Sequence, residues 1–179
     1  MGNTDTYHSI ACPSTSLCWA GDGAGQQDEY YDTASPPTII SATAPAYSDT
    51  LTGLNQTLTN GASSVDIATN GWTTGWSVWL TSSLFCTASC TQSANIPQTG
   101  TLTSDTCDTT CTTAVDTVGY PYSLPEGSGP PTATKLFNAS SGSGEGNQTI
   151  NFDWTANIPA NIPAGNFSTT WTYTISSTP

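Results

Sequence analysis

The chain has 179 residues, enough for one domain with an extension, and only 8% of them are charged, against about 25% in an ordinary soluble domain. Thirteen acidic residues stand against one lysine (Lys135), one histidine (His8) and no arginine, so the formal net charge is −12. Such a chain cannot neutralise phosphates, which excludes nucleic acid as a partner, and an anionic membrane surface would repel it. No apolar run approaches the roughly 18 residues of a membrane span.

Thr, Ser, Asn and Gly take the place of the usual charged coat, which is typical of proteins outside the cell. The six cysteines agree with that location, because they fall in three closely spaced pairs that read as disulfides in an oxidising compartment. The pairs are Cys12/Cys18, Cys86/Cys90 and Cys107/Cys111. The alternative is a metal site formed by the last four thiolates. We favour disulfides, because a cytosolic zinc site would normally lie among lysines and arginines.

The spacing leaves the disulfide connectivity open. We expect Cys12 to bond Cys18 as a local clip. For the other four we slightly favour a crossed ladder, because its outer loop would stabilise by roughly 3.5 kcal/mol against about 2 for a five-residue loop. The ladder joins Cys86 to Cys111 and Cys90 to Cys107, and the alternative is two local loops.

The chain divides near Pro36-Pro37. Residues 1–36 carry no periodic apolar pattern, only Gly-rich and acidic stretches around the first cysteine pair. We therefore predict an N-terminal extension over residues 1–36 and one folded domain over 37–179.

From Thr38 onward the apolar period is two, as in strands with one buried face. Thr-rich strands are expected over 38–47 and 51–58, followed by an Asn60-Gly61 turn signal and a weakly alternating segment over 63–69. The strongest early strand covers 75–85. One face carries Trp76, Val78, Leu80 and Leu84, and the other carries Ser77, Trp79, Thr81 and Phe85.

The C-terminal half holds the clearest alternation. A Cys- and Thr-rich segment (86–118), a Pro/Gly-rich loop (120–131) and a Ser/Gly hairpin tip (139–147) precede two strands. Their inward faces are Ile150, Phe152, Trp154, Ala156 and Ile158, and then Phe167, Thr169, Trp171, Tyr173 and Ile175. No ten-residue stretch has a helical period. The sequence thus predicts an all-β fold, an antiparallel β-sandwich of about seven to nine strands with an extended N-terminal segment.

No catalytic constellation stands out, and we expect neither enzymatic activity nor a cofactor. The only glutamates, Glu29, Glu126 and Glu145, lie in polar loops with nothing to pair them across a sugar bond. His8 is the sole candidate base for a nucleophile. The acidic run from Asp22 to Asp32 lacks the spacing of a calcium loop, so we expect no metal there.

Two kinds of surface residue are candidates for contacts. Trp79 lies on the face opposite the predicted core, near Phe85, where it would stack on a sugar ring or a partner subunit or be covered by another segment. Four Asn-x-Ser/Thr sequons are candidate glycosylation sites: Asn55, Asn138, Asn147 and Asn166.

Two segments carry a family resemblance. The Gly71-Trp72 strand that runs to Phe85, and the turn Ile162-Pro163-Ala164-Gly165-Asn166-Phe167 with the strand that ends at Pro179, are similar to the WxL-domain family of Gram-positive surface proteins and their actinobacterial relatives. The likeness covers about residues 38–179. In place of Trp-x-Leu this chain has Trp76-Ser77-Val78 and Trp171-Thr172-Tyr173. The resemblance implies a secreted β-sandwich that attaches non-covalently to the cell wall or assembles with other surface proteins.

Two functional hypotheses follow. The first is a structural subunit of an extracellular filament or surface layer, a homopolymer in which an N-terminal strand is donated to the next copy. The expected inserted strand is β-prone, uncharged and short, with Thr38, Ile39, Ile40, Ala42 and Ala44 as its members. The alternative is a surface module that binds cell-wall glycan or another carbohydrate through Trp79 and its aromatic neighbours.

Overall fold

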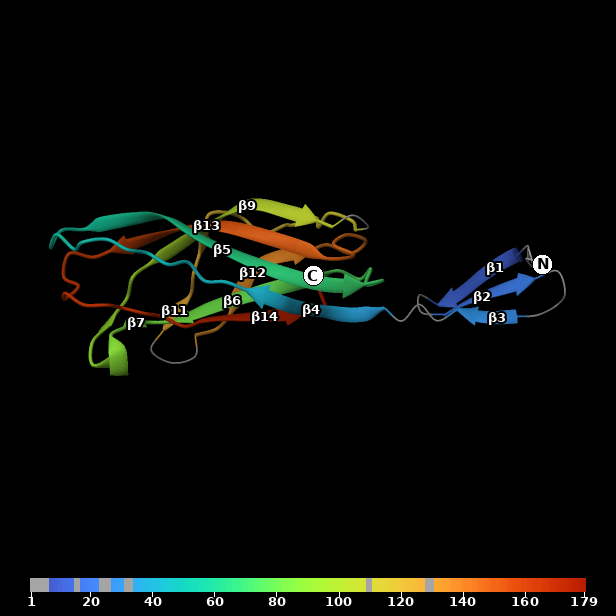
Figure 1. Cartoon of the computed structure of the whole chain (residues 1–179), viewed down its shortest axis with the longest axis horizontal. Helices are drawn as coiled ribbons and strands as arrows, with labels where there is room; N and C mark the ends of the chain where they lie inside the picture. The colour runs from blue at the N-terminus through green and yellow to red at the C-terminus, as the bar shows by residue number, and fades with distance from the viewer. Residues whose placement is uncertain (1–6, 15–16, 23–26, 31–33, 109–110, 128–130) are drawn as a thin grey trace, which may run out of the picture.

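The computed structural model describes residues 7–14, 17–22, 27–30, 34–108, 111–127 and 131–179, with only the backbone described for residues before 34 and for Asn60. The regular secondary structure of this part of the chain is almost entirely β-strand, and mainly antiparallel sheets form a sandwich-like fold, as the sequence predicts. Figure 1 shows the sheets of the sandwich stacked over one another. The strands are β1 (Tyr7–Ser14), β2 (Leu17–Asp22), β3 (Gln27–Tyr30), β4 (Ser35–Ala42), β5 (Gln56–Asn70), β6 (Trp76–Ser83), β7 (Phe85–Cys86), β8 (Ser93–Ala94), β9 (Gln98–Cys107), β10 (Tyr122–Ser123), β11 (Glu126–Gly127), β12 (Thr134–Ala139), β13 (Gln148–Ile158) and β14 (Trp171–Ser176), with one 3-10 turn, η1 (Ala88–Cys90).

Two sheets make up the sandwich. The first has five strands in the order β10-β9-β13-β5-β4. In the second, β6 pairs with β12 and β11 and also with β14. The strands β4 and β14 lie side by side along one flank (Figure 1), where the hydroxyl of Tyr173 donates to the carbonyl of Thr43 (3.0 Å).

The core lies between these sheets, and its centre is β13. All the inward residues predicted for that strand, from Ile150 to Ile158, are buried. Trp76, Val78 and Leu80 of β6 face them and are fully buried. Trp171, Tyr173 and Ile175 of β14 point inward as predicted, but they are only partly buried because β14 forms the flank of its sheet.

Several boundaries differ from the sequence predictions. The Asn60-Gly61 pair makes no turn, because β5 runs through it for 15 residues. The register shift there is a β-bulge in which Thr59 and Asn60 lie opposite Thr155, and Gly61 pairs with Trp154. Leu51 lies outside any strand. The strands β9 and β12 were not predicted, because β9 is Thr-rich with few apolar residues and β12 is only six residues long.

The N-terminal extension also differs from the prediction. Its described backbone is not one extended segment, since β1, β2 and β3 pair antiparallel as a sheet of their own (Figure 1, blue). The predicted Cys12–Cys18 clip, His8 and the acidic run from Asp22 to Asp32 concern side chains outside the described part of the chain.

The predicted crossed disulfide ladder is wrong. The bonds are local, Cys86–Cys90 and Cys107–Cys111. The first pair lies beside the start of β9 and the second at its end, and ten residues of strand at about 3.3 Å each separate them by roughly 30 Å. Because a disulfide needs Cα atoms within about 7 Å, the ladder would require β9 to be unfolded.

The first testable consequence is a disulfide map. Non-reducing proteolysis with mass spectrometry should recover the local pairs Cys86–Cys90 and Cys107–Cys111. Any peptide that joins one pair to the other would contradict the path of β9.

The second consequence concerns Trp154, which is 1% exposed. Trp154→Ala should lower the free energy of unfolding by about 3–5 kcal/mol, because the substitution leaves a large cavity between the sheets. Urea unfolding followed by circular dichroism measures it. Thr101→Ala, at an exposed position of the neighbouring strand, is the control and should change the same quantity by less than about 1 kcal/mol. A Trp154→Ala protein as stable as this control would contradict the packing.

Candidate functional site

A groove of about 420 Å³ with a mixed polar and apolar lining lies at one end of the sandwich, beneath the segment that leads from β4 to β5. We call residues 35–55 the strap, because this segment runs along the sandwich before β5 begins (Figure 1). Residues 44–49 and Leu51 of the strap line one side of the groove. The other side is a second, smaller core of buried and partly buried side chains: Leu58, Phe85, Ile96, Ala156, Ile158, Ile162 and Phe167.

Tyr47 is the main side chain that anchors the strap here. Its ring occupies the space beside Gly61, where a Cβ atom would lie 2.5 Å from the Tyr47 Cε1 atom. The phenol oxygen is buried without a hydrogen-bond partner, and burial raises its pKa well above the usual range. The contact therefore depends on ring packing against a glycine backbone, with an orphaned polar atom as its cost.

Few other side chains hold the strap. Of the eight residues in β4, only Pro37 is buried, while Ile40 is 61% exposed. The pairing of β4 with β5 has two register shifts. Besides Tyr47, the strap is attached by backbone pairing, by short polar contacts such as that from the Ser41 hydroxyl to Asp66 (2.5 Å), and by Ile39 and Leu51, which are partly buried against the two cores.

These contacts correct the position expected for the inserted strand. Thr38, Ile39 and Ala42 lie on the β5 edge of the same chain, and Ala44 lines the groove beyond the end of β4. The sandwich edge is therefore already covered. A second copy can receive this strand only after the strap of the acceptor has moved away.

The two aromatic residues proposed for a glycan or partner contact are not brought together. Phe85 is 9% exposed and belongs to the smaller core, so burial removes it from any exposed aromatic patch. Trp79 is partly buried, its indole N–H donates to the Ser77 hydroxyl (3.0 Å), and the Lys135 ammonium lies 5.7 Å from its ring centroid. A sugar would have to displace that lysine to stack on the same face of the ring.

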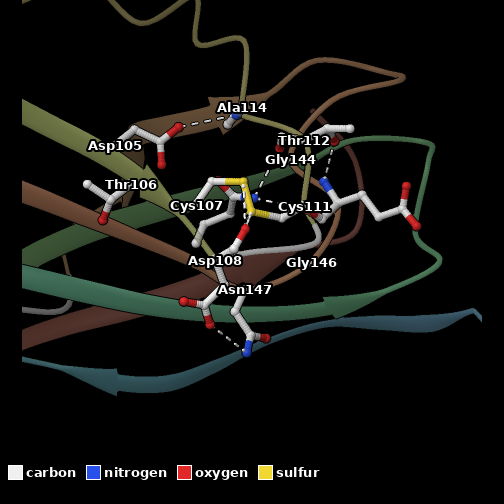
Figure 2. The surroundings of a disulfide bond; sticks show 12 residues. Asp105, Thr106, Cys107, Asp108, Cys111, Thr112, Ala114, Gly144, Gly146 and Asn147 are labelled. Carbon is white, nitrogen blue, oxygen red and sulfur yellow. Dashed lines mark hydrogen bonds between the residues drawn. A yellow bond between two sulfur atoms is a disulfide. The ribbon is translucent and has the colours of Figure 1, made fainter.

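A more polar recess of about 510 Å³ lies at the other end of β9, next to the second disulfide. Figure 2 shows Asp108 and Asn147 beside the Cys107–Cys111 bond, and the Asn147 amide donates to the Asp108 carboxylate (3.4 Å). Glu145 completes the acidic lining. Among the side chains that the structure describes, no three metal-ligating residues gather in one place.

Two neighbouring carboxylates, Asp105 and Asp116, have structural roles that the sequence did not reveal. Asp116 accepts hydrogen bonds from the amides of Val118 and Asn138 (3.0 Å each) and from the Tyr120 hydroxyl (2.8 Å). Asp105 accepts one from the amide of Ala114 (3.2 Å). Burial, aided by the nearby Asp116 charge, raises the Asp105 pKa. Both carboxylates tie the loop after the second disulfide to the strands beneath it.

The four sequons fall into two groups. Asn55, Asn147 and Asn166 are exposed. Asn138 is 2% exposed, and its carbonyl oxygen accepts hydrogen bonds from the amide (3.2 Å) and hydroxyl (2.8 Å) of Thr117. A glycan on the Asn138 amide nitrogen would have no room at this burial, so we do not expect glycosylation of that residue in the folded protein.

Comparison of the chain with protein-family models, with curated proteins and with solved structures finds no match. Within the described residues, no helix is long and apolar enough to cross a membrane.

The sequons give the third testable prediction. In a host that performs N-linked glycosylation, secreted folded protein should carry glycans at Asn55, Asn147 or Asn166 and none at Asn138. Glycopeptide mass spectrometry measures the occupancy, and Asn138→Asp is the matched variant expected to lower stability without removing a glycan. A glycan on Asn138 of the folded protein would contradict its buried placement.

Proposed function

We propose that this chain is a non-enzymatic structural protein of the cell exterior that assembles with copies of itself, as a subunit of a filament or surface layer. The observation that carries the proposal is the strap: a segment near the N-terminus that follows the edge of the sandwich with a single fully buried side chain, Pro37, in its strand. The local disulfides and the low charge support an extracellular location.

Exchange of the strap between copies requires no contacts other than those that the strap already makes with its own sandwich. The contacts described above join the strap to the rest of its own sandwich: β4 to β5, Tyr47 to Gly61, and Thr43 to Tyr173. The same contacts would form if the strap came from a second copy, so their energies cancel between the closed and exchanged states. The balance then depends on chain entropy and protein concentration.

The unfilled groove favours exchange further. The strap of the same chain leaves about 420 Å³ open over Phe85, Ile96 and Ile158, so its fit is incomplete. A side chain of a neighbouring copy that entered the groove would gain apolar contact there at about 25 cal/mol per Å² buried, in addition to the contacts of the exchanged strap. Head-to-tail repetition of this step produces an open filament, whereas reciprocal exchange would stop at a dimer.

The 71–85 and 162–179 segments resemble WxL domains, and this resemblance favours the wall of a Gram-positive or actinobacterial cell as the location of the assembly. Under this proposal the wall contact is non-covalent. Binding of cell-wall glycan remains the alternative function.

The fourth prediction tests exchange directly. Thr38 and Ala68 lie opposite each other in the β4–β5 ladder, and neither is buried. When a Thr38→Cys protein is mixed with an Ala68→Cys protein and oxidised, a disulfide between the two variants should form only if β4 of one copy lies on β5 of another. A mixture of Thr38→Cys with Thr101→Cys is the control and should give only background cross-linking.

The double variant Thr38→Cys/Ala68→Cys supplies the complementary test. Oxidised as a monomer, it holds the strap on its own sandwich and should remain monomeric in light scattering, while the unmodified protein forms large species or fibres visible by electron microscopy at high concentration. If the unmodified protein also stays monomeric and no mixed disulfide appears, the assembly proposal fails and glycan binding becomes the better hypothesis.

A further inference from the structure

A small polar cluster lies inside the sandwich where β11 covers one edge of β6. Glu126 is the parallel partner of Ser82, and the Gln98 side chain donates its amide N–H to Glu126 Oε1 (3.4 Å). Ser82 and Gln98 are 1% and 2% exposed. Polar groups at such burial normally have partners.

Three oxygens of this cluster have none: Ser82 Oγ, Gln98 Oε1 and Glu126 Oε2. If Glu126 is ionised, its Oε2 and the Gln98 Oε1 are both pure acceptors and cannot satisfy each other. A protonated carboxyl offers an O–H donor at that position. The amide and the acid then form a matched pair, with N–H donating to Oε1 on one side and O–H donating to the amide oxygen on the other.

The surroundings of Glu126 offer an ionised carboxylate no compensating charge. The strands β6 and β14 and residues 84–97 contain no charged side chain. The titratable group on the neighbouring β10 is the Tyr122 phenol, which bonds to the carbonyl of Leu80 (3.2 Å). The only lysine of the chain, Lys135, lies over the Trp79 ring. Burial accordingly raises the pKa of Glu126 from 4.5 to about 7, and hydrogen bonds from Gln98 and the Ile96 amide offset only part of this shift.

We propose that Glu126 keeps its proton in mildly acidic solution, that it shares this proton with Gln98, and that loss of the proton loosens β11 from the edge of β6. The release has a defined structural result. The carbonyls of Pro125 and Gly127 accept the amides of Ser82 (3.0 Å) and Leu84 (3.2 Å), so the departure of β11 frees two donors on an edge of the second sheet. An exposed strand edge of this kind is a pairing site for another chain.

The direction of the pH effect follows from linkage. Because the folded protein binds this proton more tightly than the unfolded chain, the stabilisation is complete below about pH 4.5 and is lost as the pH rises to about 7. Above about pH 7 Glu126 is ionised in both the folded and the unfolded state, so it causes no further change in the free energy of unfolding.

The fifth prediction uses the fact that the chain contains only three glutamates, Glu29, Glu126 and Glu145. Protein labelled with ¹³C at the glutamate carboxyls should give three resonances, and the one missing from Glu126→Gln should titrate with a midpoint near pH 7. A midpoint near the ordinary value of 4.5 would overturn the proposal. The measurement on the unsubstituted protein does not depend on the stability of any variant.

A stability comparison tests the consequence. Glu126→Gln reproduces the neutral amide–acid pairing at every pH, so its thermal midpoint should match that of the unsubstituted protein near pH 4.5 and exceed it by a few degrees at pH 7.5. Hydrogen exchange at Ser82 and Leu84, corrected for intrinsic rates, should accelerate with pH in the unsubstituted protein but not in Glu126→Gln. Glu145→Gln, in the β12–β13 connection, is the control and should keep the original pH dependence. Parallel curves for the unsubstituted and Glu126→Gln proteins would show that β11 is not held by this proton.

Discussion

The packing of Trp154 is the constraint on which the rest of the sandwich depends. Its strand neighbours on both sides are glycines, Gly61 of β5 and Gly100 of β9. A Cβ atom at Gly100 would lie 2.7 Å from the indole, so the ring fills the space that the glycine leaves. The indole N–H donates to the Ser63 hydroxyl (2.8 Å), and the ring meets Trp171 of the other sheet at a centroid distance of 4.6 Å. One side chain therefore sets the register of three strands and joins the two sheets.

A scarcity of cations governs the polar interior. With a single lysine, which lies over Trp79, the partly buried carboxylates have no cation to pair with, so each is held by N–H and O–H donors or keeps its proton. Asp116 follows the first course, with two backbone amides and the Tyr120 hydroxyl. Under our proposal Glu126 keeps its proton, because its Oε2 atom has no donor and lies in a cluster with an unmatched amide oxygen, that of Gln98. Under the same proposal, the scarcity of cations makes this part of the interior sensitive to pH.

The central strands of the sandwich are held more firmly than the strands at its edges. The β13–β5 and β13–β9 ladders are long and buried, whereas β4 and β11 are edge segments with few buried side chains. Reversible pairing with other copies requires such edges, because a segment packed into the main core could not leave without unfolding the domain. Because β4 and β11 belong to different sheets, the proposed assembly through the strap and the proposed pH response at β11 can be tested separately.

The sequence alone determined the strand class and the inward faces of β6, β13 and β14, because the period of two at Trp76, Trp154 and Trp171 is a local property of the backbone. It did not reveal β9, whose Thr-rich pattern lacks apolar alternation, and so it did not reveal that the length of β9 separates the two disulfides. Asn60-Gly61 carries a turn signal in the sequence. Only the tertiary structure shows that the Tyr47 ring packs directly against the backbone of Gly61. The orphaned oxygens of Gln98 and Glu126 were equally invisible, since residues 28 positions apart meet only when the sheets stack. The period of a strand can be read from the local sequence. Burial and the loss of hydrogen-bond partners cannot, because they arise only from contacts between distant segments.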